Sequence, residues 1–149
     1  MALNFSKYAQ EGNAFVGKLA DRLGHPEETN RTGNILRAVL HTLRDRLTVS
    51  ESLHLLSQLP MFLKAVYVEN WKYQETPSQI NTVEEFKTEV KKQQAQYGES
   101  EFNWEKHTDE IISIVLEELG TYITEGEASH VMAQLPKELE EYFRASISH

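Results

Sequence analysis

Two pairs of residues in this chain have the types and the spacing of metal ligands. Glu51 and His54 stand three positions apart, as do Glu127 and His130, so each pair would share one face of a helix. A Glu-x-x-His pair from each of two helices, joined by further glutamates, is the ligand set of di-iron carboxylate bundles. A metal-binding carboxylate and histidine bundle is therefore one hypothesis for this protein.

The same glutamates have a second interpretation as helix-capping residues. Thr48 precedes Glu51 by three positions, and Thr124 precedes Glu127 in the same way. This is the spacing of a capping box, in which the threonine oxygen accepts from the glutamate amide and the glutamate reaches back to the threonine amide. Because capping explains both glutamates without a metal, we expect no metal and no other cofactor.

A basic stripe offers a different chemistry. Arg37, His41 and Arg44 recur at helical spacing, opposite the apolar face of their segment, and the bend that follows at Thr48 is reminiscent of a helix-turn-helix. Such a stripe could contact nucleic acid, but a formal net charge of −8 would repel a duplex. The simpler interpretation is a solvated helix face, or one paired with the acidic second half of the chain, so we expect no nucleic-acid binding.

Signatures of catalysis are missing from the sequence. The segment from Gly12 to Lys18 matches the first seven positions of a phosphate-binding loop, but Leu19 stands where that motif needs serine or threonine, and no strand precedes it. The absence of cysteine excludes disulfides and a thiol nucleophile. We therefore expect a protein without catalytic activity.

An internal repeat reveals the elements that position these residues. Residues 35–67 align with residues 111–143 at an offset of 76 without a gap, and 11 of the 33 positions are identical, including Gln-Leu-Pro at 58–60 and 134–136. The shared apolar residues follow helical spacing, which predicts long helices from Pro26 and from just after Asn103, each ending near the threonine. Leu43 and Leu119 should be equivalent core residues.

The other expected helices complete two matching sets of four. A first helix carries Phe15 and ends at Gly24, and its counterpart starts at an N-cap on Thr82. Short third helices begin at the capping threonines, and fourth helices begin at Pro60 and Pro136. We thus expect an all-α helix bundle built from two tandem, internally duplicated four-helix units, 1–73 and 82–149, joined by a linker at 74–81 and packed about a pseudo-two-fold axis.

The repeated signature resembles a known family. Leu47-Thr48, Glu51 and the Gln-Leu-Pro run, followed by Tyr67 and Trp71, resemble the bacterial domain of unknown function 2267, from about residue 15 to residue 143. The resemblance implies the duplicated all-α architecture but no mechanism, since that family has no established activity. An acidic insertion from Glu99 to Asn103 departs from the pattern.

The two halves differ most in charge. Residues 1–75 sum to +1 and residues 76–149 to −9. We expect a cytoplasmic helical interaction or scaffolding module, monomeric or weakly dimeric, without a membrane segment. A cationic peptide or protein partner would suit an acidic face in the second half formed by Glu117, Glu118, Glu138, Glu140 and Glu141. The alternative is that this acidity only maintains solubility.

Overall fold

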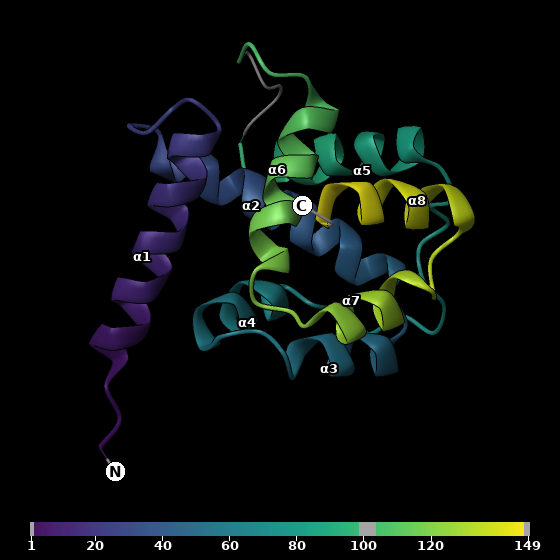
Figure 1. Cartoon of the computed structure of the whole chain (residues 1–149), viewed down its shortest axis with the longest axis horizontal. Coiled ribbons are helices and arrows are strands. Elements are labelled where there is room, and N and C mark those ends of the chain that lie inside the picture. The colour runs from purple at the N-terminus through teal and green to yellow at the C-terminus, as the bar shows by residue number, and fades with distance from the viewer. Residues whose placement is uncertain (1, 99–103, 148–149) are drawn as a thin grey trace.

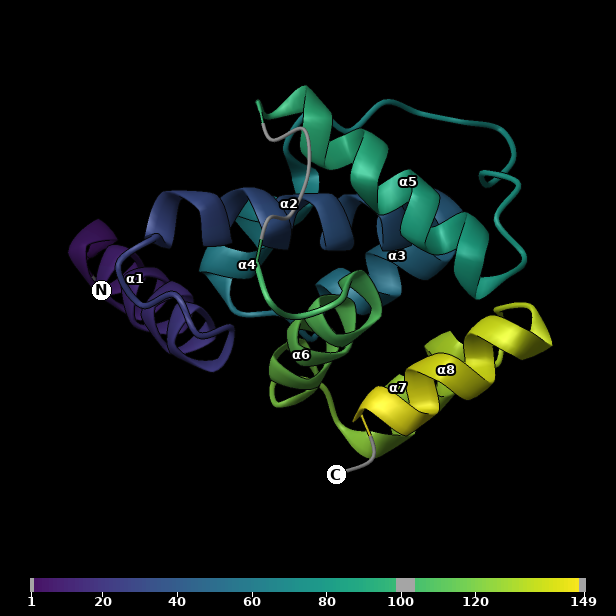
Figure 2. The same cartoon turned by 90° about the horizontal axis from the view of Figure 1, so that it is seen from above.

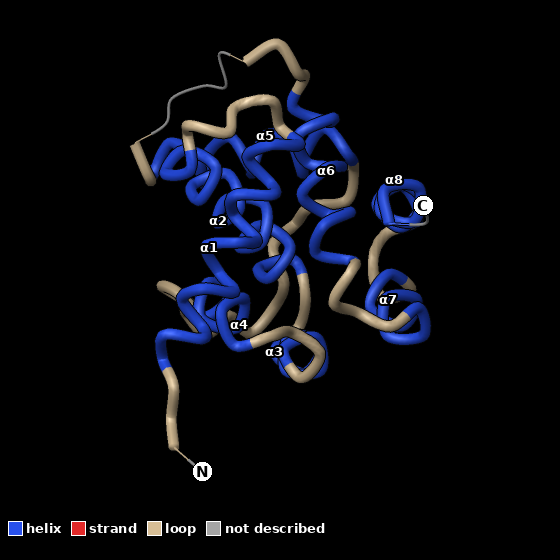
Figure 3. Tube along the Cα trace, turned by 60° about the vertical axis from the view of Figure 1, so that its left-hand side comes forward, coloured by secondary structure: helices blue, strands red, loops and turns tan. Residues whose placement is uncertain are grey.

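The chain is helical throughout the part that the structure describes. The computed structural model describes residues 2–98 and 104–147, and no strand occurs in those ranges (Figure 3), so the all-α prediction is confirmed. The helices are α1 (Phe5–Arg22), α2 (Thr29–Arg46), α3 (Val49–Leu56), α4 (Met61–Val68), α5 (Val83–Gln96), α6 (Thr108–Gly120), α7 (Glu125–Met132) and α8 (Lys137–Ile147). The expected insertion at 99–103 lies outside the described residues, and so does Asn103, after which the second long helix was expected to start.

Three threonines begin helices as the sequence predicts. Thr48 and Thr82 each form a complete capping box, in which the hydroxyl accepts from the amide three residues on and that residue's carboxylate accepts from the threonine amide. Thr124 accepts from the amide of Glu127 at 3.2 Å, but the Glu127 side chain turns to His54 instead of returning to Thr124. The predicted capping box at Thr124 is therefore only half formed.

Both long helices begin later than the sequence predicts. α2 starts at Thr29 instead of Pro26, because Gly24 has a positive φ of 85° and the amide of Glu28 closes a turn onto the carbonyl of His25. α6 starts at Thr108, after an extended residue, His107. The boundaries are wrong by one turn at each helix, whereas the existence of both helices is confirmed.

α2 is the central element of the molecule. It contacts α1, α4, α5 and α6, and α5 lies along it (Figures 1 and 2). Ten of its residues are buried, so it has almost no solvent face over its second half; they are Thr32, Ile35, Leu36, Ala38, Val39, Leu40, His41, Thr42, Leu43 and Arg44. An amphipathic pattern predicts one buried face, and α2 instead is enclosed by helices from both halves of the chain.

A single apolar core joins the helices. Leu43 is 7% exposed and Leu119 is 4% exposed, which confirms the prediction that both are buried. They line one small apolar cavity of about 40 Å³, enclosed by α2, α3, α6, α7 and α8. Because this cavity is bounded by residues from both halves of the sequence, the two halves share their core.

No helix within the described ranges has the length and apolar character required to cross a lipid bilayer.

Candidate functional site

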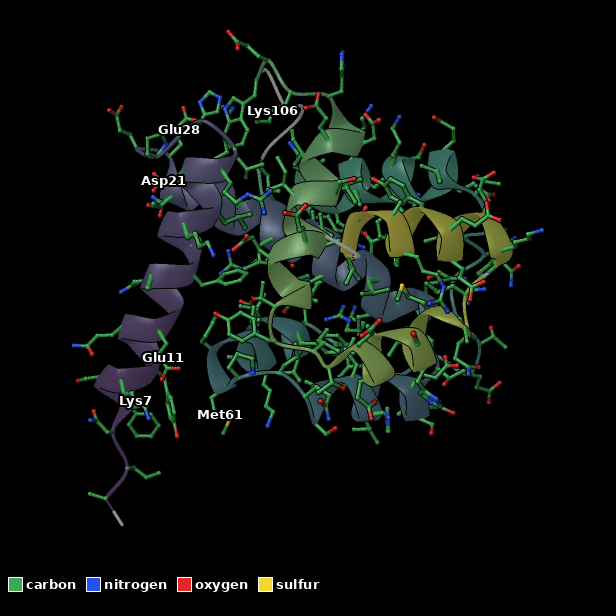
Figure 4. All side chains as sticks on the ribbon, viewed as in Figure 1. Lys7, Glu11, Asp21, Glu28, Met61 and Lys106 are labelled. Carbon is green, nitrogen blue, oxygen red and sulfur yellow. The ribbon has the colours of Figure 1, made fainter. Side chains whose placement is uncertain are left out.

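An apolar groove runs between the N-terminal half of α1 and α4. Its volume is about 770 Å³, and Phe5 from α1 with Met61 and Val68 from α4 lie along it at 69%, 52% and 46% exposure. Lys64 is the only charged side chain among the described residues that line it. In Figure 1 no other helix covers the outer side of α1 here, and Figure 4 shows Met61 on the same side of the molecule as Lys7 of α1.

The floor of the groove is set by close helix packing. A Cβ atom on Gly12 would lie 3.3 Å from the Cβ of Phe62, so the glycine lets α1 approach α4 closely. Phe62 in turn packs against Phe15 and Tyr122, with ring centroids 5.6 and 5.8 Å away. Gly12 therefore serves helix packing inside α1, and the segment that matched part of a phosphate-binding loop is ordinary helix.

Sequence reasoning missed this groove. The signal was present in α4, whose eight residues include only one that is charged, Lys64. Leu63 and Tyr67 of this helix are fully buried. A helix that is apolar on every side has more apolar surface than one core contact covers, so the remainder, Met61 and Val68, stays in water.

Three of the four expected metal ligands come together at the contact between α3 and α7. His54 Nε2 contacts the carboxylate of Glu127, and the rings of His54 and His130 lie 4.8 Å apart between centroids. Glu51 stays at the start of α3, where its carboxylate accepts from the Thr48 amide at 2.8 Å. Across residues 2–98 and 104–147, no three histidine or carboxylate side chains are placed to hold one metal ion.

The α6 glutamates of the expected acidic face point toward α1. Glu118 is 5% exposed and pairs with Arg22 at 2.8 Å and Lys18 at 3.3 Å, while Glu117 pairs with Arg22 at 2.9 Å. The hydrogen bond to Glu118 is the main reason that the pKa of Arg22 is raised. These two carboxylates hold α6 against α1.

The α8 glutamates have partners of a different kind. Glu140 pairs with Arg144 at 3.1 Å along the same helix, and the Glu138 carboxylate accepts from the amide of Val83 at the start of α5. Glu141 is exposed. The five glutamates are thus distributed over two helices, and four of them are used in contacts within the chain.

The basic stripe of α2 is covered at two of its three residues, so the solvated-face interpretation is wrong for His41 and Arg44. The alternative of pairing with the acidic second half is wrong as well, because the carboxylates that Arg37 and Arg44 contact, Glu69 and Asp45, lie in the first half. His41 is 1% exposed and Arg44 is 5% exposed, because the end of α4 and the helix α5 cover them. Arg44 Nη1 donates to the carbonyls of Tyr67 and Glu69 at 2.8 and 2.7 Å, and so satisfies the C-terminal end of α4. Arg37 reaches the Glu69 carboxylate at 2.8 Å. The stripe is therefore unavailable to a nucleic-acid duplex.

His41 completes this buried network. Its Nε2 lies 2.6 Å from the carbonyl of Val66, which can only accept, so Nε2 carries a hydrogen. Nδ1 lies 3.0 Å from the hydroxyl of Tyr97 on α5. Burial lowers the pKa of His41, and the charge of Arg44 lowers it further. At neutral pH the ring is therefore uncharged and accepts at Nδ1 from Tyr97.

The two tryptophans lie at separate places in the fold. Trp71 packs edge-on against Tyr67 beside Arg44, with ring centroids 5.7 Å apart. Trp104 stacks on His25 at 4.1 Å and donates to Glu28, which attaches the segment before α6 to the turn between α1 and α2. Each ring packs against residues of the first half of the chain.

Comparison with known proteins identifies the family of this chain and nothing more specific. The model of a family described as uncharacterized conserved protein, DUF2267, matches residues 12–104, more than half of the chain, from the groove-floor glycine in α1 through α5. No functionally curated protein matches the sequence. The resemblance is therefore confirmed over residues 12–104, whereas it was expected to extend to about residue 143, and the chain belongs to the DUF2267 family of uncharacterized conserved proteins.

Proposed function

We propose that this protein is a small helical protein-interaction module without catalytic activity, and that the groove between α1 and α4 is its docking surface. The observation that supports this proposal is a continuous apolar groove of about 770 Å³ with Phe5, Met61 and Val68 exposed along it. Soluble proteins rarely leave a contiguous apolar surface of this kind without a binding role. The groove suits docking better than the acidic glutamates, since most of those are used within the chain.

The proposed occupant is one amphipathic helix of a partner protein. The lining residues of α1 run from Phe5 to Val16, which is about 16 Å at 1.5 Å per residue, or three helical turns. Fourteen of the described residues line the groove, whereas a standard interface between two folded proteins takes about 20 to 30 residues from each side. A short helix fills a groove of this size, with apolar anchors at positions i, i+3 or i+4, and i+7.

Charge at the groove adds one requirement on the partner. Lys64 lies among apolar side chains and has no acidic neighbour within 4 Å among the described residues. A carboxylate on the flank of the incoming helix would satisfy it and would fix the direction of docking. The partner is therefore an apolar helix that carries at least one acidic residue at its edge.

We also propose that the architecture arose by duplication, with units 1–73 and 82–149 related by a pseudo-two-fold axis. Supporting features are the 11 identities in 33 positions and the equal role of Thr48 and Thr124 as N-caps of eight-residue helices. The equivalent helices α3 and α7 contact each other, as a pair related by such an axis could. A cytoplasmic location and a monomeric or weakly dimeric state complete the proposal, and the lack of cysteine supports the former.

Peptide selection tests the proposed function directly. A displayed library of amphipathic helices about 15 residues long is selected against the whole protein, and the best peptide is titrated into ¹⁵N-labelled protein. We expect perturbed amides along α1 and α4. Met61→Asp and Val68→Asp should each weaken binding by about tenfold or more, because each places a charge where an apolar side chain would be buried.

The matched control is Leu53→Asp, since Leu53 is 58% exposed on α3 and does not line the groove. It should leave the peptide affinity unchanged. Selected peptides that bind elsewhere, or that respond equally to Leu53→Asp and Met61→Asp, would show that the groove is not the docking surface.

A further inference from the structure

A second, polar cavity lies on the other side of the α4 end. It has a volume of about 390 Å³, is partly open to solvent, and is bordered by α2, by the segment that follows α4, and by α5. His41, Arg44 and Asp45 form its α2 wall, and Lys72 and Tyr97 face them. Four amide side chains complete the lining: Asn70, Gln74, Gln93 and Gln96. This volume is within the range of small-molecule sites, and its lining is polar where that of the groove is apolar.

Arg44 is the fixed cation of the cavity. Nη1 donates to the carbonyls of Tyr67 and Glu69, and Nε donates to Asp45 at 3.0 Å. The hydrogen bonds formed with described residues use no N–H of Nη2, although a guanidinium carries five N–H donors. Arg44 is therefore held rigidly by its other contacts and has two donors left for a ligand.

The charges around the cavity favour a single negative charge. Arg44 and Lys72 are cationic, and Asp45 is the one carboxylate among the lining residues, so their formal sum is +1. Asp45 is already engaged by Arg44 Nε. His41 adds no charge, since its ring hydrogen-bonds Val66 and Tyr97 in the neutral form. A bound group with one negative charge would bring the cavity to neutrality.

We propose that this cavity is a binding site for a small polar oxyanion, a carboxylate or a phosphate, held between Nη2 of Arg44 and the ammonium of Lys72. The amides of Gln93 and Gln96 from α5, with Asn70 and Gln74 from the opposite segment, are placed to bond hydroxyl or carbonyl groups of the same molecule. The planar guanidinium matches the geometry of an oxyanion. Because backbone carbonyls already hold it in place, little side-chain conformational entropy is lost when the anion binds. This inference does not depend on the groove.

The test uses the whole protein and two probes, L-lactate and inorganic phosphate. Each is titrated to about 20 mM into ¹⁵N-labelled protein, a range that detects millimolar affinity. We expect the Nε signal of Arg44 and the amide of Tyr97 to shift and saturate with at least one probe. A response to lactate alone identifies a carboxylate ligand, and a response to phosphate alone identifies a phosphate ligand.

Two substitutions distinguish binding in the cavity from a general effect of positively charged side chains on anions. Lys72→Gln removes one cavity charge from an exposed position and should weaken the affinity about fivefold. Lys7→Gln makes the same charge change on α1, at the far end of the molecule in Figure 4, and should leave the affinity unchanged. Equal weakening by both variants, or no saturable shift of the Arg44 signal with either probe, would overturn the proposal.

Discussion

Replacing Leu43 by alanine should be one of the most destabilising single changes in the core. Leu43 is 7% exposed and borders a cavity of about 40 Å³ that already separates α2 from α6 and α7. Three carbon atoms are removed, and at about 0.8 kcal/mol each their loss from the core costs about 2.4 kcal/mol. The side chains around Leu43 already leave a cavity unfilled, so we expect them to leave the larger void of the variant unfilled as well.

The enlarged void adds a second cost. At about 24 cal/mol per Å³, growth of the cavity by about 60 Å³ costs about 1.4 kcal/mol more. The sum is about 4 kcal/mol, within the range of about 2 to 5 kcal/mol found for buried leucines. For a chain of this length, 1 kcal/mol lowers Tm by about 2 to 4 °C, so Tm should fall by about 8 to 16 °C.

Leu53→Ala is the matched control, because it deletes the same atoms from a leucine that is 58% exposed on α3. Urea and thermal unfolding followed by circular dichroism should show less than about 1 kcal/mol for this variant. The dry, apolar void of Leu43→Ala should also bind benzene, which should raise the Tm of that variant and of no other. If Leu43→Ala and Leu53→Ala lower Tm equally, the assignment of Leu43 to the shared core is refuted.

Three further outcomes follow from the contacts within the chain. The pKa of His41 is lowered by burial, so the folded state is at full stability above about pH 6.5 and should lose stability as the pH falls below it; His41→Gln should flatten the dependence of Tm on pH between about 7.5 and 5. Arg22→Ala leaves the buried carboxylate of Glu118 with Lys18 alone and should cost about 1 to 3 kcal/mol in urea unfolding, whereas a loss below about 0.5 kcal/mol would contradict the pairing. Elemental analysis of protein purified without chelators should find no stoichiometric transition metal, and a metal retained by the wild type and lost in His54→Ala would restore the metal hypothesis.

Local signals in the sequence predicted the helices themselves and the starting residues of the three that a threonine caps. Thr48, Thr82 and Thr124 are N-caps as expected, since a cap depends on the hydroxyl of one residue and an amide three positions later. Leu43 and Leu119 are buried as expected, because the apolar stripe of a helix must face the core in any packing. The late start of α2 escaped prediction, since the turn after Gly24 competes locally with helix.

Tertiary structure decided what each polar side chain does. Arg44 is buried because it bonds the carbonyl of Tyr67, 23 residues away, and His41 is buried because Tyr97, 56 residues away, covers it. The same kind of long-range contact draws the Glu127 side chain away from Thr124 to His54. A sequence shows which face of a helix is apolar, but the opposite face is exposed or covered according to segments far along the chain. The polar cavity and the apolar groove both arise from such contacts, so neither could be found until the helices were placed in space.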